Sequence, residues 1–238
     1  MGYTICILVG VALAFVVRRL APEPPPPHQH ALSLIAIIGA LGGAVLFELP
    51  ADFFGWTASV AGEPIVTHAM GGRTVVGGMR GGWIAVELGK WGLGIRQPTG
   101  DGFALSLAVG LACGRLGCFF AGCCAGRTSD GHAWWSVLSL PGRNGLPRFP
   151  AQLTEMGFHA LAAVALLALA RAGKLRTRRF AAYVALYAGF RFAIETVRDN
   201  PPLALGLTYY QWLALPLFAL AAGTFLARRP RLALGAAP

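Results

Sequence analysis

Apolar residues occur along this chain in seven long blocks, each separated from the next by a short polar stretch. The blocks lie at about 2–17, 31–49, 75–92, 103–121, 152–170, 180–197 and 207–227. Roughly 20 mostly apolar residues in a helix cross the ~30 Å hydrocarbon core of a bilayer. The pattern therefore predicts an all-α polytopic membrane protein with about seven transmembrane helices, built as a single integral-membrane domain over 1–238.

Two of the seven blocks need a closer look. Block 75–92 has the weakest hydropathy, because it is rich in glycine and carries Arg80 and Glu87. Block 2–17 has no basic segment before it and ends at Arg18 and Arg19, where a signal peptide would have small residues. We therefore expect the first block to be a retained helix.

Composition excludes the soluble and the disordered classes. Apolar residues make up 55% of the 238 residues, charged residues only 13%, and the mean hydropathy is +0.59. A soluble domain has about 25% charged residues. The net charge of +10 would favour a nucleic-acid partner in a soluble protein, so the positions of the basic residues matter.

The basic residues follow the membrane topology. Bacterial and other membrane proteins concentrate Lys and Arg in cytoplasmic loops. One side of the seven blocks holds Arg18, Arg19, Lys90, Arg96, Arg171, Lys174, Arg176, Arg178, Arg179, Arg228, Arg229 and Arg231, and the other holds Arg73, Arg127, Arg143, Arg148 and Arg198. This alternation predicts an N-terminus outside, a C-terminus in the cytoplasm, and no nucleic-acid partner.

The loops differ in character. Residues 21–30 are rich in proline, which predicts a stiff, extended connector. The loop at about 122–151 is long, falls on the outer side, and contains Trp134 and Trp135, which suit the membrane interface. There is no internal repeat of the kind that many transporters have.

Charged residues inside the blocks are the first functional candidates, because a charge within a membrane span is costly. Five of them stand out: Glu48, Arg80, Arg115, Arg191 and Glu195. Arg191 and Glu195 are four residues apart and share a helix face, which predicts an ion pair. Arg115 and Arg191 have few carboxylates nearby in the sequence, so they favour binding of an anion such as a phospholipid headgroup.

Cysteines cluster at Cys113, Cys118, Cys123 and Cys124. Packing residues, a disulfide near the outer face and a reactive thiol all remain open as interpretations. The spacing is neither C-x-x-C nor that of a zinc site with histidine, so we expect no metal and no cofactor. A proton acceptor at the outer face would come from His68, His132 or this cysteine cluster.

Several motifs resemble those of the bacterial prolipoprotein diacylglyceryl transferase family. Residues 114–130, GRLGCFFAGCCAGRTSD, resemble its signature G-R-x-G-N-F-x-N-G-E-x-x-G-R. VVGGMRGGW (75–83) is similar to its H-G-G-x-x-G-G segment, and FPAQLTE (149–155) to its H-P-x-Q-L-Y-E. YAGFRFAIETVRD (187–199) and LTYYQWLALP (207–216) resemble its last two motifs. The matches keep the order of the family.

The resemblance implies transfer of diacylglycerol from phosphatidylglycerol to the lipobox cysteine of a secreted preprotein, at a site toward the outer leaflet of the bacterial inner membrane. It implies that Arg115 and Arg191 bind the phosphate and that Glu195 orients Arg191, with Cys118 and Cys123 as further catalytic candidates. The implied substrate-binding residues are Gly77, Gly78, Gly117, Gly122, Gly126, Arg127, Gln152, Glu155 and Arg198.

The chain also departs from the family. Val76 stands where the family has its His, and Cys118, Ala121 and Cys123 replace Asn, Asn and Glu of the signature. The phosphate-binding half of the site is thus retained while the acid–base half differs. Two alternatives follow: a related transfer to another acceptor, or a non-catalytic phospholipid-binding membrane protein. A cluster of glycines, at Gly71, Gly72, Gly77, Gly78, Gly81 and Gly82, is better explained by close helix contact than by a phosphate loop.

Overall fold

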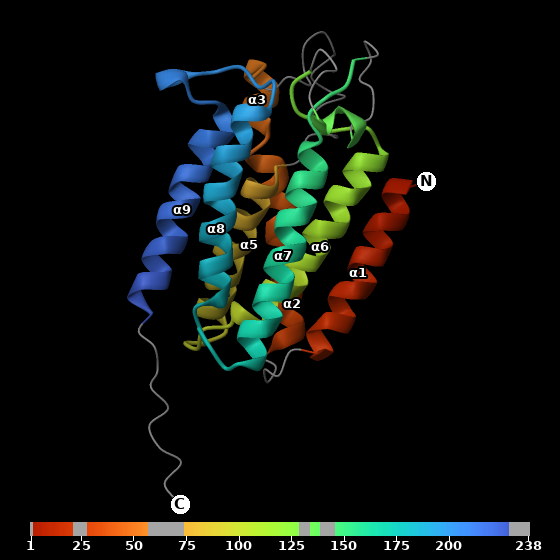
Figure 1. The fold of residues 1–238 in the computed structure, drawn as a ribbon. Helices are drawn as coiled ribbons and strands as arrows, with labels where there is room; N and C mark the ends of the chain where they lie inside the picture. Colours follow the sequence, from red (N-terminus) through yellow and green to blue (C-terminus); the bar gives the residue numbers. More distant parts are fainter. Residues whose placement is uncertain (1, 21–27, 57–73, 129–133, 139–145, 229–238) are drawn as a thin grey trace, which may run out of the picture. The chain divides into compact units, whose positions relative to one another are not determined.

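The computed structural model describes residues 2–20, 28–56, 74–128, 134–138 and 146–228, and within these residues it contains helices and no β-strand (Figure 1). The α-helices are α1 (Gly2–Leu20), α2 (Gln29–Leu46), α3 (Leu49–Phe54), α5 (Val75–Gly92), α6 (Asp101–Phe120), α7 (Ala151–Arg171), α8 (Arg179–Ile194) and α9 (Tyr209–Ala227). Short 3-10 helices are η1 (Trp134–Leu138), η2 (Glu195–Val197) and η3 (Ala204–Gly206). The prediction of an all-α protein is confirmed.

Each of the seven predicted blocks is helical in the structure. Six segments are long and apolar enough to cross a membrane: Gly2–Leu20, Gln29–Phe54, Asp101–Phe120, Ala151–Arg171, Arg179–Val197 and Tyr209–Ala227. The helix α5 has sufficient length, but its 18 residues include Arg80, Glu87 and Lys90. The described residues therefore make a multi-pass membrane protein with six candidate spans, and a seventh crossing by α5 stays a prediction.

The chain divides into two compact units. The first unit comprises residues 1–24, 98–183 and 222–238, and the second comprises 25–97 and 184–221. The expected single domain over 1–238 stays a prediction, and each unit is described by itself below. The predicted proline-rich connector is outside the described residues at 21–27, as are His68 and His132.

In the first unit α6 packs against α1 and against α7. Figure 1 shows α1 and α6 side by side and running in opposite directions. Gly117 of α6 allows this approach, because a Cβ there would lie 3.1 Å from the Tyr3 ring and 3.2 Å from the Cys6 Cβ. The signature glycine Gly117 is thus explained by packing against α1.

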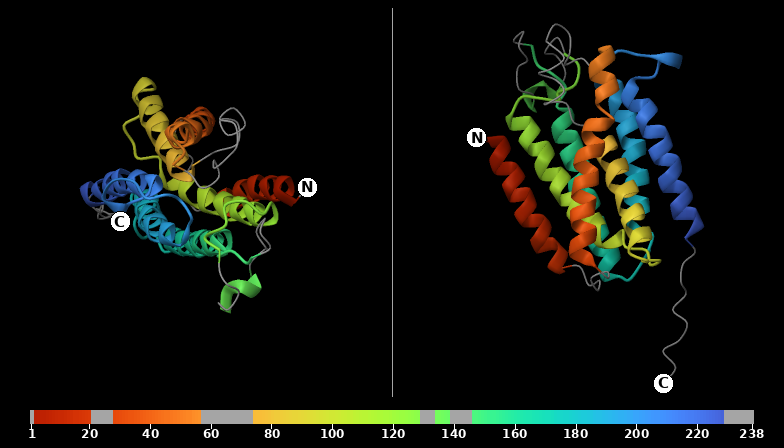
Figure 2. Two further views of the ribbon diagram at one scale, coloured as in Figure 1. Left: turned by 90° about the horizontal axis from the view of Figure 1, so that it is seen from above. Right: turned by 180° about the vertical axis from the view of Figure 1, so that it is seen from behind.

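In the second unit α2 and α5 lie side by side (Figure 2), and glycines of both helices face the contact. A Cβ on Gly43 would lie 2.5 Å from the Gly77 carbonyl oxygen, and a Cβ on Gly77 would lie 2.7 Å from the Gly43 carbonyl oxygen. Gly78 also faces α2, with its Cβ position 3.3 Å from the Ala40 oxygen. The prediction that these glycines serve close helix contact is confirmed.

The contact between α2 and α5 can be tested with two neighbouring glycines. We expect Gly43→Ala to destabilise the protein by about 1–3 kcal/mol, because overpacking forces the two backbones apart. Gly42→Ala is the matched control, since its Cβ position has nothing within 4 Å and alanine is the better helix former. Thermal unfolding in detergent should show a lower Tm for Gly43→Ala alone. Equal Tm values for both variants would contradict this account of the contact.

Candidate functional site

A buried ion pair joins α6 to α7 in the first unit. The Arg115 Nη2 atom lies 2.6 Å from Glu155 Oε2, and the two side chains are 10% and 0% exposed. A buried guanidinium requires such a partner, because an isolated charge in a low-dielectric interior is costly. The partner of Arg115 is distant in sequence: Glu155, 40 residues further along the chain, is brought to it by the packing of α6 on α7.

A polar pair lies one helical turn beyond Glu155. His159 of α7 is fully buried, and its Nδ1 atom is 2.8 Å from the hydroxyl oxygen of Tyr183 on α8. Four residues separate Glu155 from His159, so both side chains project from the same face of α7. His159 has no assigned role in the sequence analysis; its spacing of four from Glu155 is the signal that could have indicated this cluster.

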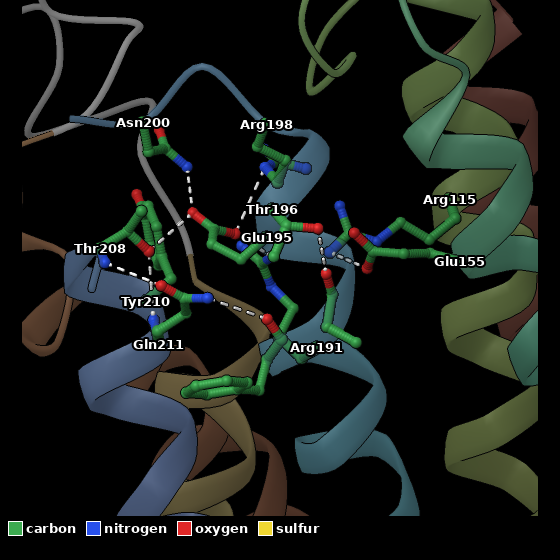
Figure 3. A network of polar contacts seen from close by, with 12 residues as sticks. Arg115, Glu155, Arg191, Glu195, Thr196, Arg198, Asn200, Thr208, Tyr210 and Gln211 are labelled. Carbon is green, nitrogen blue, oxygen red and sulfur yellow. Dashed lines mark hydrogen bonds and ion pairs between the residues drawn. The ribbon is translucent and has the colours of Figure 1, made fainter. Parts of the chain in front are cut away.

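Glu195 is the centre of the polar network in the second unit (Figure 3). Its carboxylate accepts hydrogen bonds from Arg191 and Asn200, and from the Thr208 hydroxyl at 3.1 Å. The Arg198 Nε atom lies 3.7 Å from the same carboxylate. The predicted ion pair of Arg191 with Glu195 is confirmed, and the carboxylate also contacts three further residues.

The network is anchored to the first turn of α9 by a capping box. Thr208 precedes α9, and its backbone N–H donates to Gln211 Oε1 at 2.9 Å. The Gln211 N–H in turn donates to the Thr208 hydroxyl at 3.3 Å. Gln211 Nε2 also donates to the Phe192 carbonyl of α8 at 3.2 Å. The T-x-x-Q spacing specifies this arrangement locally, and it holds Thr208 beside Glu195.

Two tyrosines of α9 connect to the end of α2. The Tyr210 hydroxyl donates to the buried Glu48 carboxylate, and the Tyr209 hydroxyl donates to the Phe47 carbonyl at 2.7 Å. The Arg191 guanidinium lies over the Tyr210 ring, 5.2 Å from its centroid. This cation–π contact is a second favourable interaction of the Arg191 guanidinium, beside its ion pair with Glu195.

Three thiols meet where α6 ends. The sulfur atoms of Cys118, Cys123 and Cys124 all lie within 4.8 Å of one another. Gly122 adopts a left-handed conformation with φ +66°, and the Cys123 N–H donates to the Cys118 carbonyl at 3.1 Å, so the chain turns back over the helix end. All five cysteines belong to the described residues, and none of them forms a disulfide.

The Cys123 thiol has a raised pKa. The hydrogen bond with Cys118 lowers this pKa, but the hydrogen bond with Cys124 and burial together raise it by more. A thiol with a raised pKa is mainly protonated at neutral pH. The raised pKa of Cys123 does not favour this thiol as the proton acceptor that the sequence analysis sought in the cysteine cluster.

The turn that carries the thiols is attached to the start of α7. Gln152 Nε2 donates to the Cys123 carbonyl at 2.5 Å. The Gly126 N–H donates to the Phe149 carbonyl at 2.8 Å, and the Arg148 Nε donates to the Gly126 carbonyl at 2.8 Å. The two motifs at 114–130 and 149–155, separated along the chain by a long loop, are thus neighbours in space.

The predicted site residues fall into two groups. In the first unit the structure brings together Arg115, Cys118, Cys123, Gly122, Gly126, Gln152 and Glu155. In the second unit Arg191, Glu195 and Arg198 share one network, while Gly77 and Gly78 belong to the helix contact. Arg127 is exposed and contacts Phe149 through its backbone, and Val76 is fully buried. Sequence reasoning did not assign His159, Tyr183, Asn200, Thr208, Tyr210 or Gln211.

Comparison with known proteins gives one consistent result. The model of the family described as prolipoprotein diacylglyceryl transferase matches residues 1–227. A phosphatidylglycerol–prolipoprotein diacylglyceryl transferase of Aromatoleum aromaticum is 31% identical over 241 residues, covering 95% of this chain and 89% of the relative. Proteins of the same name from an Azoarcus species and from Bordetella bronchiseptica are 33% and 32% identical, covering 90% and 80% of this chain and 85% and 72% of the relatives.

Glu195 should be a principal source of stability in the second unit. We expect Glu195→Ala to lower the free energy of unfolding by about 3–5 kcal/mol, because it leaves the buried Arg191 without its carboxylate. Thr196→Ala is the control, since Thr196 is exposed and bonds only locally, to the Ala193 carbonyl. Denaturant titration followed by circular dichroism measures both. A loss below 1 kcal/mol for Glu195→Ala would show that the network contributes little.

Proposed function

The chain belongs to the prolipoprotein diacylglyceryl transferase family, and on this basis we propose that it transfers the diacylglyceryl group of phosphatidylglycerol to the cysteine thiol of a secreted preprotein. The observation that carries the proposal is the pair of buried arginines, Arg115 and Arg191, each held by a buried carboxylate. Both arginines stand in the motifs at 114–130 and 187–199. A phospholipid is the anion that a membrane supplies to such groups.

The reaction needs a nucleophile and a stabilised leaving group. The thiolate sulfur of the acceptor attacks the glycerol carbon of the diacylglyceryl group, and a thioether bond forms. The carbon–oxygen bond to the phosphate breaks, and its electron pair leaves with glycerol phosphate. The proton of the thiol goes to solvent. Charge therefore develops on the phosphate, where prearranged donors lower the barrier.

Arginine suits this task for a geometric reason. A planar guanidinium meets two phosphate oxygens with parallel N–H groups, which the single ammonium of lysine cannot do. A guanidinium has five N–H donors, so one carboxylate does not exhaust its capacity. Glu155 and Glu195 act here as positioning residues: each fixes the orientation of one arginine. We extend the proposal to Arg198, whose guanidinium also contacts Glu195.

The turn at 122–127 is the second part of the proposed site. Gly122 and Gly126 shape its backbone, and Gln152 holds it against α7. Arg127 is exposed at this turn, where a basic group attracts an anionic lipid surface. The proposed location is the bacterial inner membrane, with this turn toward the outer leaflet.

A related transfer to a different acceptor is the second candidate. It is favoured by Val76, which is fully buried where the family has His, and by the thiols at 118 and 123 in place of signature Asn and Glu. A non-catalytic phospholipid-binding role is the candidate from another class. Both differ from the first proposal in one outcome: neither restores lipidation of a prolipoprotein.

The proposed activity is tested by complementation of a bacterial strain depleted of its own diacylglyceryl transferase, together with transfer assays on purified protein. We expect rescue by the wild-type chain. Arg115→Lys and Arg191→Lys should each lower transfer about 10–100-fold, because a hydrogen bond to a charged group contributes about 1.5–3 kcal/mol. Arg176→Lys, at an exposed position, should leave transfer unchanged.

Two results would contradict the proposal. Failure to rescue, with confirmed membrane insertion and bound phosphatidylglycerol, would favour the two alternatives. Near-normal transfer by both lysine variants would remove the bidentate phosphate contact as the basis of the mechanism, since lysine retains the charge and loses only the planar geometry.

Topology is tested by labelling in sealed cells. In a background without the five native cysteines, we expect an impermeant thiol reagent to label Thr128→Cys and to leave Ala172→Cys unlabelled. Both positions are exposed, so burial does not bias the comparison. Permeabilised cells, in which both should react, are the control. Labelling of Ala172→Cys before permeabilisation would reverse the proposed orientation.

A further inference from the structure

The thiols of Cys118, Cys123 and Cys124 form a group with the dimensions of a metal site. Their sulfur atoms all lie within 4.8 Å of one another. A tetrahedral zinc ion with Zn–S bonds of about 2.3 Å separates its thiolates by about 3.8 Å. Small rotations of the side chains therefore reach ligand spacing. We propose that these three cysteines bind one Zn²⁺ as thiolates and leave its fourth coordination position open.

The backbone prearranges the three ligands. The helix α6 ends at Phe120, and Gly122 reverses the chain so that Cys123 and Cys124 return beside Cys118. The Cys123 N–H bond to the Cys118 carbonyl closes this turn at 3.1 Å. Little conformational entropy is then lost when an ion binds, because the ligands are already together.

Contacts with α7 hold the turn from the other side. Gln152 is 97% buried, and its amide donates to the Cys123 carbonyl at 2.5 Å. The Gly126 N–H donates to the Phe149 carbonyl at 2.8 Å. Metal sites depend on such supporting bonds, since these orient the ligands that touch the ion. The group is thus carried by two helices and not by a loop alone.

The ligand chemistry selects the ion. Thiolates are soft ligands that favour zinc and monovalent copper over magnesium or calcium. Three protein ligands with one open position is the pattern of catalytic zinc, whereas structural zinc sites use four. Cys123 and Cys124 are exposed, so the fourth position is accessible. Three thiolates and one Zn²⁺ carry a net charge of −1, and the basic residue Arg115 stands one turn before Cys118 on α6.

The open position has a natural occupant, and this step rests on the proposed function. The acceptor of the transfer is a cysteine thiol, and a thiol that binds zinc loses its proton, here to solvent. The zinc-bound thiolate sulfur attacks the glycerol carbon, the carbon–oxygen bond breaks, and glycerol phosphate leaves with the electron pair. The thioether product is a poorer ligand than a thiolate, so it dissociates from the ion.

Sequence spacing did not reveal this group. The cysteines form no C-x-x-C pair and have no histidine at zinc spacing, which is why the sequence predicts no metal. The turn at Gly122 supplies what the spacing lacks, because it brings residues five and six positions apart to one point.

Metal binding is tested on the full-length protein, purified in detergent under reducing conditions, with Co²⁺ as a spectroscopic probe. We expect about one Co²⁺ per chain with thiolate charge-transfer and tetrahedral d–d bands, displaced by Zn²⁺. Cys118→Ser, Cys123→Ser and Cys124→Ser should each weaken binding by more than about 100-fold, because loss of a supporting residue alone costs about 10–100-fold. Cys113→Ser, in the same helix and outside the group, is the matched control and should bind normally.

Several outcomes would overturn the zinc site. They are no binding by the wild-type protein, wild-type affinity in all three serine variants, binding of Cu⁺ alone, or a disulfide among the three thiols in native membranes. Cys123 and Cys124 are exposed, so their serine variants leave helix packing undisturbed, and their folding is verified by circular dichroism and an unchanged Tm.

The acceptor step has its own measurement. Adding a lipobox-type cysteine peptide to the Co²⁺-loaded protein should shift the d–d bands, and the same peptide with serine should not. Absence of a shift in a protein that binds Co²⁺ and transfers diacylglycerol would overturn the acceptor step. Normal Co²⁺ binding without any transfer from phosphatidylglycerol would instead refute the proposed function and leave the metal site in place.

Discussion

The structure depends on one constraint: a charge placed among apolar helices must have an opposite charge beside it. Arg115 and Arg191 are both buried, and each is held by a buried glutamate. The desolvation of such a pair is costly, and only good geometry with additional hydrogen bonds offsets it. This explains why Glu195 is surrounded by Asn200 and Thr208 as well as by arginines. The polar residues of each unit follow from what its arginine requires.

Close helix approach is the second condition, and it complements the first. Glycines at positions 43 and 77 let α2 and α5 come together, and Gly117 does the same for α6 against α1. In a bilayer, moving an apolar side chain from lipid to a contact with another helix contributes little free energy, because both environments are apolar. Close packing of small residues therefore contributes more to helix association than burial does. Substituting these glycines would move helices, and with them the polar groups that the helices carry.

Much of the fold, and part of the candidate site, could be predicted from the sequence. Helix positions followed from the length of the apolar blocks, and the ion pair of Arg191 with Glu195 followed from their spacing of four. Long-range partners did not follow: Glu155 reaches Arg115, and Glu48 reaches Tyr210, only through the packing of separate helices. The thiol group was missed for a different reason, since its geometry comes from a turn in which Gly122 and Cys124 are both left-handed. Thr208 and Gln211 could have been found, because T-x-x-Q is a local signal.

Thr208 links the carboxylate of Glu195 directly to the cap of α9. Its hydroxyl donates to Glu195 and also accepts from the backbone of Gln211 in the first turn of α9. An anion that draws Arg191 away from Glu195 therefore alters the polarisation of the bond that begins α9. Binding of an anion to Arg191 is in this way coupled to fraying of α9. Amide hydrogen exchange at the start of α9 then reports anion binding in a region that the anion does not touch.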